Sequence, residues 1–314
     1  MSVFNACHIP FFGDAHVLRI QECALPEIKK NQLLVNVVAA SVNPIDFKTR
    51  AGLGWVAKEI KDNLPWVPGF DMAGIISAVG DEDNEHLMGQ YVFGMIGIPF
   101  KGGAYSEYCT VEKDEVLFVP PKVDLRQAAA LPLAGLTAFQ ALQYGKVKAG
   151  DRVLIFGATG GVGHIAAQLA SIQGAKVICT GSEAKREALS ALDFQWQWQD
   201  ESGLVNQDFD LVVDCVGGEP AINLLNQLGQ VTNVVTLPTL TADAVKQAAS
   251  LKNTACFNFL VEVNNQQLQT MIDWIAEGLL QIYVAKTYGL NDVAMAHIAL
   301  EEGQYAGKVL LDLG

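Results

Sequence analysis

Four glycines fall within seven positions of one short stretch that lies between two apolar runs. The stretch is LIFGATGGVGHIAAQL, residues 154–169, with glycine at 157, 160, 161 and 163. Glycine at this density weakens a regular helix or strand, so the backbone there must need freedom from side chains. Residues 152–156 predict a buried strand before the turn, and a helix is expected from about Val162. A strand, a bare turn and a helix indicate a site where backbone approaches a phosphate-bearing ligand.

The turn has the sequence context of a dinucleotide site. Gly157, Gly160 and Gly163 permit the tight turn, the approach of backbone to a pyrophosphate, and close packing of helix on strand. The spacing is G-x-x-G-x-x-G rather than G-x-G-x-x-G, so an ordinary strand–helix turn is the alternative, although one or two glycines would suffice for that. The other turn residues expected to bind the cofactor are Thr159, Gly161 and Val162.

The end of the following strand, VICTGSEAKR, indicates which dinucleotide binds. In NAD sites a carboxylate at this point accepts hydrogen bonds from the adenosine ribose. This chain has Gly181 and Ser182 there, with Lys185 and Arg186 close behind. A carboxylate would repel a 2′-phosphate, so its absence beside these cations predicts NADP(H), with Lys185 as a contact. For Arg186, the solvated face of the next helix is an equally good interpretation.

The pattern of apolar and polar residues along the chain changes near residue 121. Before it, short β-type runs such as QLLVNVVAAS and YCTV are broken by Pro and Gly, which predicts an irregular β-rich domain. After it, continuous apolar strands alternate with helical stretches, which is typical of a doubly wound parallel sheet. CFNFLV, residues 256–261, is the expected last strand of that sheet. The closing run, GKVLLDLG, either extends the sheet or returns to the first domain.

Composition excludes several classes of protein. The 314 residues allow about two domains. A net charge of −13 argues against nucleic acid or an anionic membrane as a general partner. No apolar run approaches the ~20 residues of a membrane span, and the N-terminus lacks the pattern of a secretory signal. The six cysteines form no C-x-x-C pair, so we expect reduced thiols and a cytoplasmic protein.

Several segments resemble one known family. AGDRVLIFGATGGVG is similar to the glycine-turn signature of the quinone oxidoreductase branch of the medium-chain dehydrogenase/reductases. The family's order is kept by SVNPIDFKTRAG, VPGFDMAGIISAVG, GGAYSEY, AALPLAGLTAFQAL, DCVGG and GKVLL. NPIDFKTRAG with LPWVPGFDMAG is similar to the plant-type alkenal and enone reductases.

The resemblance implies an α/β fold with two domains. A GroES-like β-barrel domain, which carries substrate and catalytic residues, is expected from residues 1–120 and completed by residues 262–314. A Rossmann domain with a doubly wound parallel sheet is expected from residues 121–261 and binds NADP(H). The cofactor would lie in the cleft between them. The family's habit, and the apolar edge that CFNFLV would leave bare, predict a homodimer.

The resemblance also identifies the positions at which zinc-dependent relatives carry their metal ligands. Zinc-dependent relatives carry Cys where this chain has Asn43, and a His-Glu pair where it has Phe70 and Asp71. Zinc needs three or four converging N, S or O ligands, and Phe70 offers none. Nothing in the chain matches the four-cysteine lobe of those relatives. We therefore expect no metal.

The expected absence of zinc limits the class of substrate. An isolated ketone would lack its Lewis acid, whereas quinones and α,β-unsaturated carbonyls are already activated and need only a few hydrogen-bond donors. We expect an NADPH-dependent oxidoreductase that transfers a hydride to quinones or α,β-unsaturated carbonyls as small-molecule substrates. The alternatives are a dedicated NADPH:quinone reductase and a non-catalytic NADPH-binding protein of the same fold.

Three residues are candidates for the substrate side. Lys48 matches the lysine of the enone reductases' N-P-x-D-x-K segment and is expected to donate to the developing oxyanion, unless it is a surface lysine on a short helix. Asn43 is expected to bond the substrate oxygen or the nicotinamide ribose, with an Asx-turn before Pro44 as the alternative. Tyr105 is expected to line the cleft, with a packed strand residue as the alternative.

Four further residues are expected at the cofactor. Thr137 matches the family's GLTA threonine near the nicotinamide, or is a hydroxyl at a helix N-terminus. Val216 and Gly217 follow the fourth strand, where the chain meets the nicotinamide ribose. Lys308 matches a family lysine at the cleft, or is a charge beside an edge strand. No role is predicted for the five histidines, His8, His16, His86, His164 and His297.

Overall fold

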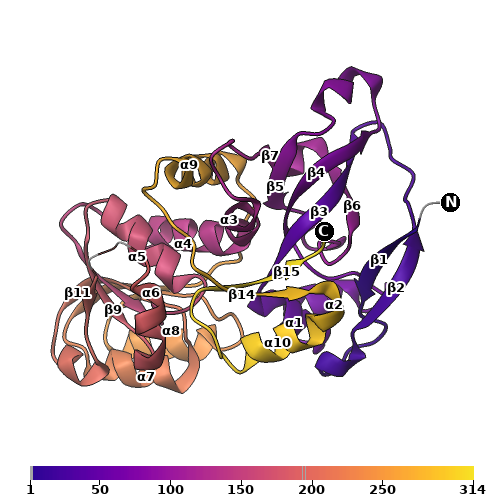
Figure 1. Ribbon diagram of the computed structural model, residues 1–314. Coiled ribbons are helices and arrows are strands. Elements are labelled where there is room, and N and C mark those ends of the chain that lie inside the picture. The colour runs from indigo at the N-terminus through magenta and orange to yellow at the C-terminus, as the bar shows by residue number, and fades with distance from the viewer. Residues whose placement is uncertain (1–2, 193, 195) are drawn as a thin grey trace. The chain divides into compact units, whose positions relative to one another are not determined.

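The computed structural model describes residues 3–192, 194 and 196–314, and the chain forms two compact units (Figure 1). The first unit contains the chain up to Leu133, with Val263–Glu277 and Val284–Gly314. The second unit contains Ala134–Glu262 and Gly278–Tyr283. Each unit has its own sheet. Among the described residues, no helix combines the length and the apolar character that crossing a membrane requires.

The second unit is built on a parallel sheet with strand order β10-β9-β8-β11-β12-β13. Its strands are β8 (Arg152–Phe156), β9 (Lys176–Thr180), β10 (Gln197–Trp198), β11 (Phe209–Asp214), β12 (Val231–Thr236) and β13 (Ala255–Phe257). The order reverses at β8, as in a doubly wound fold. The predicted parallel sheet is confirmed. Of the segment expected as its last strand, only Cys256 and Phe257 lie in β13.

Helices connect these strands and bury the sheet. They are α4 (Pro132–Tyr144), α5 (Gly163–Ile172), α6 (Glu183–Leu189), the 3₁₀ helix η4 (Glu201–Leu204), α7 (Gly218–Gln227) and α8 (Ala242–Leu251). Leu154 and Val212 pack in one buried cluster with Leu224 of α7 and Val245 of α8. Strands covered in this way are apolar along their whole length, which is why the sequence shows them as continuous runs.

The first unit is a mostly antiparallel β structure with sheet order β14-β15-β3-β4-β5-β7, and β6 also pairs with β3. Its strands are β3 (Gln32–Val42), β4 (Asp71–Val79), β5 (Tyr91–Met95), β6 (Tyr108–Glu112), β7 (Leu117–Phe118), β14 (Val284–Gly289) and β15 (Lys308–Asp312), with a separate hairpin of β1 (Val3–His8) and β2 (Arg19–Ala24). Figure 1 shows the yellow β15 beside β3, and Val309 pairs with Val42. The closing run therefore returns to the first domain.

The first unit also contains five helices among its described residues. They are α1 (Pro44–Arg50), α2 (Gly54–Ile60), α3 (Leu125–Ala130), α9 (Asn265–Ala276) and α10 (Val293–Glu301), with 3₁₀ turns η1 (Ala15–Val17), η2 (Glu82–Leu87), η3 (Lys113–Glu115) and η5 (Leu290–Asp292). Of these helices, α3 and α10 contact the strands of this sheet. Helix α1 begins at Pro44, whose fixed φ suits a first helical position. The carboxylate of Asp46 accepts from the backbone N–H of Asn43 at 2.8 Å. The sequence around Asn43 therefore starts α1 directly at the end of β3.

Candidate active site

The glycine turn packs α5 directly against the end of β8. Gly157 has φ +85°, and a Cβ on Gly163 would lie 2.2 Å from the carbonyl oxygen of Gly157. The N–H groups of Gly157 and Ala158 both donate to the carbonyl of Thr180, at 3.1 and 2.9 Å. Only glycine fits these positions, so the backbone at the N-terminus of α5 stays bare. A bare helix N-terminus of this kind suits a pyrophosphate.

The buried side chain of His164 links the glycine turn to the backbone of Tyr283, a role that the sequence did not predict. The ring is fully buried; its Nδ1 lies 2.9 Å from the carbonyl oxygen of Gly160, and its Nε2 lies 3.2 Å from the backbone N–H of Tyr283. Because the N–H of Tyr283 donates to Nε2, Nδ1 carries the proton and donates to Gly160. One turn along α5, Gln168 donates to the carbonyl of Gln281 at 2.8 Å. Two polar residues four apart in an apolar helix were the available signal.

The end of β9 excludes a carboxylate by its packing. A Cβ on Gly181 would lie 2.9 Å from Oγ1 and 3.0 Å from Cγ2 of Thr159, which is itself buried in the glycine turn. Any larger residue would have to push Thr159 aside. Ser182 is the exposed N-cap of α6, and Lys185 lies half-buried one turn later. The structure therefore places all four residues at one corner of the sheet.

A buried carboxylate shapes the loop after β11. Oδ1 of Asp214 accepts from the backbone N–H groups of Val216 (2.9 Å) and Gly217 (2.8 Å), and Oδ2 accepts from the hydroxyl of Thr236 at 2.7 Å. Burial raises the pKa of Asp214, and these three hydrogen bonds oppose that shift. Gly217 has φ +73°, and Val216 is left 44% exposed. Asp214 thus positions a loop that presents Val216 outward.

The glycine turn and the loops after β9 and β11 meet at the carboxyl ends of the strands of the second unit's sheet. β9 and β11 both pair with β8, so the glycine turn, Gly181 and Val216 follow the carboxyl ends of three adjacent strands. The carboxyl ends of the strands, at the point where the strand order reverses, are the usual ligand site of doubly wound sheets. Thr137 lies inside α4 and is half-buried, not at the helix N-terminus. The geometry of the turn fits a dinucleotide.

In the first unit, Lys308 is the centre of a buried polar network. Its Nζ donates to Oδ1 of Asn43 at 2.5 Å, and Nδ2 of Asn43 donates to Oδ2 of Asp71 at 2.9 Å and to the carbonyl of Ser41 at 3.3 Å. Oδ1 of Asp71 accepts from the N–H of Leu133 at 2.9 Å. Both amide hydrogens of Asn43 are used in these bonds. Asn43 therefore links a cation to a carboxylate inside the protein.

A second carboxylate, Asp46, extends the network to Tyr105. The fully buried Tyr105 donates its hydroxyl to Oδ2 of Asp46 at 3.0 Å. Burial raises the pKa of Asp46 to about 7 and that of Asp71 to about 6. Burial lowers the pKa of Lys308, whereas the charges of Asp71 and Asp46 favour its ammonium form. Lys308 is thus an internal counter-ion, not a charge beside an edge strand.

The donor set at the positions of the zinc ligands does not fit a zinc ion. Phe70 is fully buried and packs its ring 5.8 Å from that of Trp66. Asn43 and Asp71 are committed to each other, with Lys308 bound to the same amide. In the part of the chain that the structure describes, no three His, Cys, Asp or Glu side chains gather as metal ligands would.

Lys48 lies on α1 between two anchors of that helix. The network of Asn43 and Asp46 holds its start, and Arg50 holds its end. Lys48 itself is half-buried, and burial lowers the pKa of its amine. A helix fixed at both ends is a rigid support for a functional side chain.

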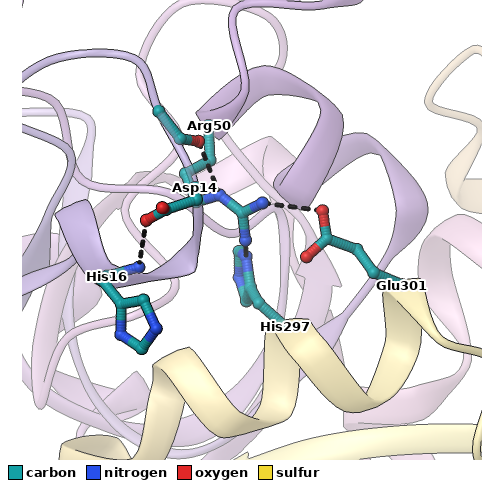
Figure 2. A network of polar contacts seen from close by, with 6 residues as sticks. Asp14, His16, Arg50, His297 and Glu301 are labelled. Carbon is teal, nitrogen blue, oxygen red and sulfur yellow. Dashed lines mark hydrogen bonds and ion pairs between the residues drawn. The ribbon is translucent and has the colours of Figure 1, made fainter.

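Arg50 is a buried cation with three bonded nitrogens (Figure 2). Nε donates to the carbonyl of Gly13 (3.2 Å), Nη1 to Nδ1 of His297 (3.1 Å) and Nη2 to Glu301 (2.7 Å). Figure 2 shows His297 and Glu301 reaching Arg50 from α10, with Asp14 and His16 on the neighbouring turn. Burial and the guanidinium lower the pKa of His297 to about 3. His297 therefore joins α1 to α10 as a neutral acceptor, which the sequence analysis did not foresee.

We expect His297 to make stability fall in acid. Its folded pKa is below the unfolded value of about 6.5, so its contribution is present above pH 6.5 and is lost as the pH falls toward 3. The stability advantage of the wild type over His297→Asn should shrink by roughly 2 kcal/mol between pH 7.5 and pH 5. Urea unfolding at both pH values measures it. Exposed His86→Asn is the control, and an advantage that does not change with pH would contradict the expectation.

Comparison with known proteins agrees with this geometry. Residues 29–121 match the alcohol dehydrogenase GroES-like domain, and residues 187–311 match the family described as zinc-binding dehydrogenase. The 2-methylene-furan-3-one reductase of Solanum lycopersicum is 33% identical over 317 residues, which cover 96% of this chain and 76% of that protein.

Two solved structures are similar over almost the whole chain. The quinone oxidoreductase of Coxiella burnetii has a TM-score of 0.91 and 36% identity, with 99% of both chains covered. The Escherichia coli quinone oxidoreductase complexed with NADPH has a TM-score of 0.83 and 26% identity, with 98% of this chain and 99% of that chain covered. The resemblance found in the sequence motifs is confirmed: the chain belongs to the medium-chain dehydrogenase/reductase superfamily, with quinone oxidoreductases and enone reductases among its homologues.

Proposed function

We propose that this protein is an NADPH-dependent oxidoreductase that transfers a hydride to quinones or α,β-unsaturated carbonyls. The observation that carries the proposal is the glycine turn at β8 beside a β9 end where Thr159 leaves no room for a carboxylate. The names of the similar proteins, a furanone reductase and two quinone oxidoreductases, support the same reaction class.

The chain's own residues divide the cofactor between them. The bare turn and the N-terminus of α5 would take the pyrophosphate, and Ser182 with Lys185 would face the 2′-phosphate. The loop of Val216 and Gly217, held by Asp214, would support the nicotinamide end together with Thr137. The bound cofactor supplies the hydride. We assign this role to residues 121–261, and the substrate side to residues 1–120 with 262–314.

On the substrate side, we assign oxyanion stabilisation to Lys48. Its partly desolvated ammonium is a charge-assisted donor for the oxygen that gains charge when a conjugated acceptor takes a hydride. Asn43 and Tyr105 have their donors committed inside the protein, so they act as positioning residues. Lys308 neutralises the carboxylates beside them. This division makes the reaction zinc-independent, because Asn43 and Asp71 serve Lys308 and not a metal.

A panel of acceptors tests the reaction class. With NADPH, 1,4-benzoquinone and 2-alkenals should be reduced and saturated ketones should not, because only conjugated acceptors spread the incoming charge. NADPH oxidation followed at 340 nm measures this, with NADH as the comparison. Reduction of quinones alone would favour a dedicated quinone reductase, and NADPH binding with no turnover would favour a non-catalytic protein. Efficient oxidation of simple alcohols would contradict the proposal.

Lys48→Met should lower turnover with conjugated acceptors by about 10²–10³-fold, the usual effect of losing one oxyanion donor. NADPH affinity should stay nearly unchanged, because Lys48 is assigned to the substrate alone. Steady-state kinetics and a fluorescence titration measure the two quantities. Lys58→Met on the exposed face of α2 is the control. Activity that prolonged chelation abolishes and zinc restores would overturn the zinc-independent mechanism.

We also propose a homodimer in a reducing compartment such as the cytoplasm. β13 is the last strand of its sheet and pairs only with β12 among the described strands. Next to it, Phe259 stacks on Tyr144 with ring centroids 4.6 Å apart, and Leu260 is 47% exposed. An apolar sheet edge of this kind favours pairing with a second copy. All six cysteines are unpaired, as a reducing compartment requires.

Light scattering at micromolar concentration should therefore give twice the mass of the chain, 33.8 kDa. Leu260→Glu should shift the mass toward the monomer, because it places a charge on the apolar segment beside the proposed paired edge. Leu251→Glu, at an 83% exposed position on α8, is the matched control and should leave the mass unchanged. A monomeric wild type would contradict the dimer.

A further inference from the structure

Arg186, left open by the sequence, makes three contacts at the end of β9. Its Nη2 lies 2.7 Å from Oδ1 of Asp200 and 3.4 Å from the carbonyl oxygen of Gly181. Its guanidinium carbon lies 5.2 Å from the ring centroid of Trp198 in β10. The side chain of Arg186 is 22% exposed, whereas that of Asp200 is 76% exposed. The arginine is therefore held in a defined orientation, and its acidic partner is largely in solvent.

The contact with Asp200 uses only some of the N–H donors of the guanidinium. Nε of Arg186 is buried and has no hydrogen-bond partner among the described residues. A planar guanidinium offers two parallel N–H donors along the edge formed by Nε and Nη2, which suits bidentate phosphate recognition. Asp200 engages that edge through Nη2 alone, and an ion pair with so exposed a carboxylate is weak. A ligand with more charge and more acceptors would be a better partner for the same edge.

The position of Arg186 indicates which ligand this is. Its Nη2 contacts the carbonyl of Gly181, the residue at the point where Rossmann sites bind the adenosine ribose. A Cβ at Gly181 would collide with Thr159, so the chain cannot place there the carboxylate that an NAD site uses. A phosphate on the 2′-oxygen of that ribose would come close to the guanidinium edge.

We propose that Asp200 tunes the preference for NADPH over NADH by competing with the 2′-phosphate for Arg186. This inference rests on the proposed use of NADPH. In the free protein Asp200 holds Nη2, and the phosphate displaces it and takes both Nε and Nη2. Trp198 keeps the guanidinium plane in place during the exchange, so little order is lost. Asp200 therefore lowers the affinity for the phosphorylated ribose without touching the rest of the cofactor.

Nucleotide fragments separate this effect from catalysis. Calorimetric titration of the full-length protein with adenosine 2′,5′-bisphosphate and with adenosine 5′-monophosphate isolates the 2′-phosphate. Asp200→Asn should tighten the bisphosphate Kd by about fivefold, the effect of one nearby charge in a largely solvated site, and leave the monophosphate Kd unchanged. Glu201→Gln removes the same charge one residue away and should change neither Kd.

A double-mutant cycle tests whether the effect passes through Arg186. Arg186→Gln should weaken the bisphosphate by at least about tenfold, and adding Asp200→Asn to it should give no further gain. A full gain in that background would overturn the competition, because it would mean that Asp200 repels the phosphate directly. An unchanged or weaker bisphosphate Kd in Asp200→Asn alone would overturn it as well.

The failure of the two proposals is distinguishable. If the wild type binds the two nucleotides equally, the proposed preference for NADPH fails. If it prefers the bisphosphate and Asp200→Asn does not tighten binding, only the role of Asp200 is refuted. Lys185→Ala, one position earlier on α6, should weaken the bisphosphate in the second case, because Lys185 is assigned to the 2′-phosphate, and should leave it unchanged in the first.

Discussion

The buried ammonium of Lys308 is the constraint around which the first unit is organised. A charge inside a protein is costly unless it is paired and hydrogen-bonded. Asn43 supplies the direct partner, and Asp71 and Asp46 supply the opposing charge. These residues come from the end of β3, the start of β4 and the first turn of α1, so the register of the closing strand and the start of α1 are fixed together. Lys48 lies on α1, so the start of this helix also fixes where Lys48 lies.

The same network explains how a fold shared with zinc enzymes is used without zinc ligands. Asn43 and Asp71 stand where zinc-dependent relatives carry Cys and Glu, and here they serve an internal cation. Phe70 is packed in the core, so in the proposed reaction the activation of the acceptor would come from its own conjugation and from donors such as Lys48. Burial raises the pKa of Asp46 to about 7, and its Oδ1 has no hydrogen-bond partner in the described chain.

Much of the fold could be predicted because its signals are local. Strands buried on both faces are continuous apolar runs, and Gly163 is required by close contacts with Gly157 and Ala158 in the same turn. Periodicity alone left the destination of the closing strand open, because the pairing of Val309 with Val42 joins distant parts of the chain, and only the family resemblance assigned residues 262–314 to the first domain. CFNFLV was expected as a strand on its apolar character, yet the ladder with β12 ends at Phe257.

The candidate site divides in the same way. Motif and spacing located the residues of the glycine turn and Lys48, but not how the side chains are bonded. The sequence assigned no role to His164 or His297, because their roles depend on Tyr283 and Arg50, which are distant in the sequence. Arg186 is the clearest case, since its own helix allows either a solvated charge or a phosphate contact. Its environment is set by Asp200, 14 residues further along, and by Trp198, so the role of a cation depends on which acceptor is free to leave it.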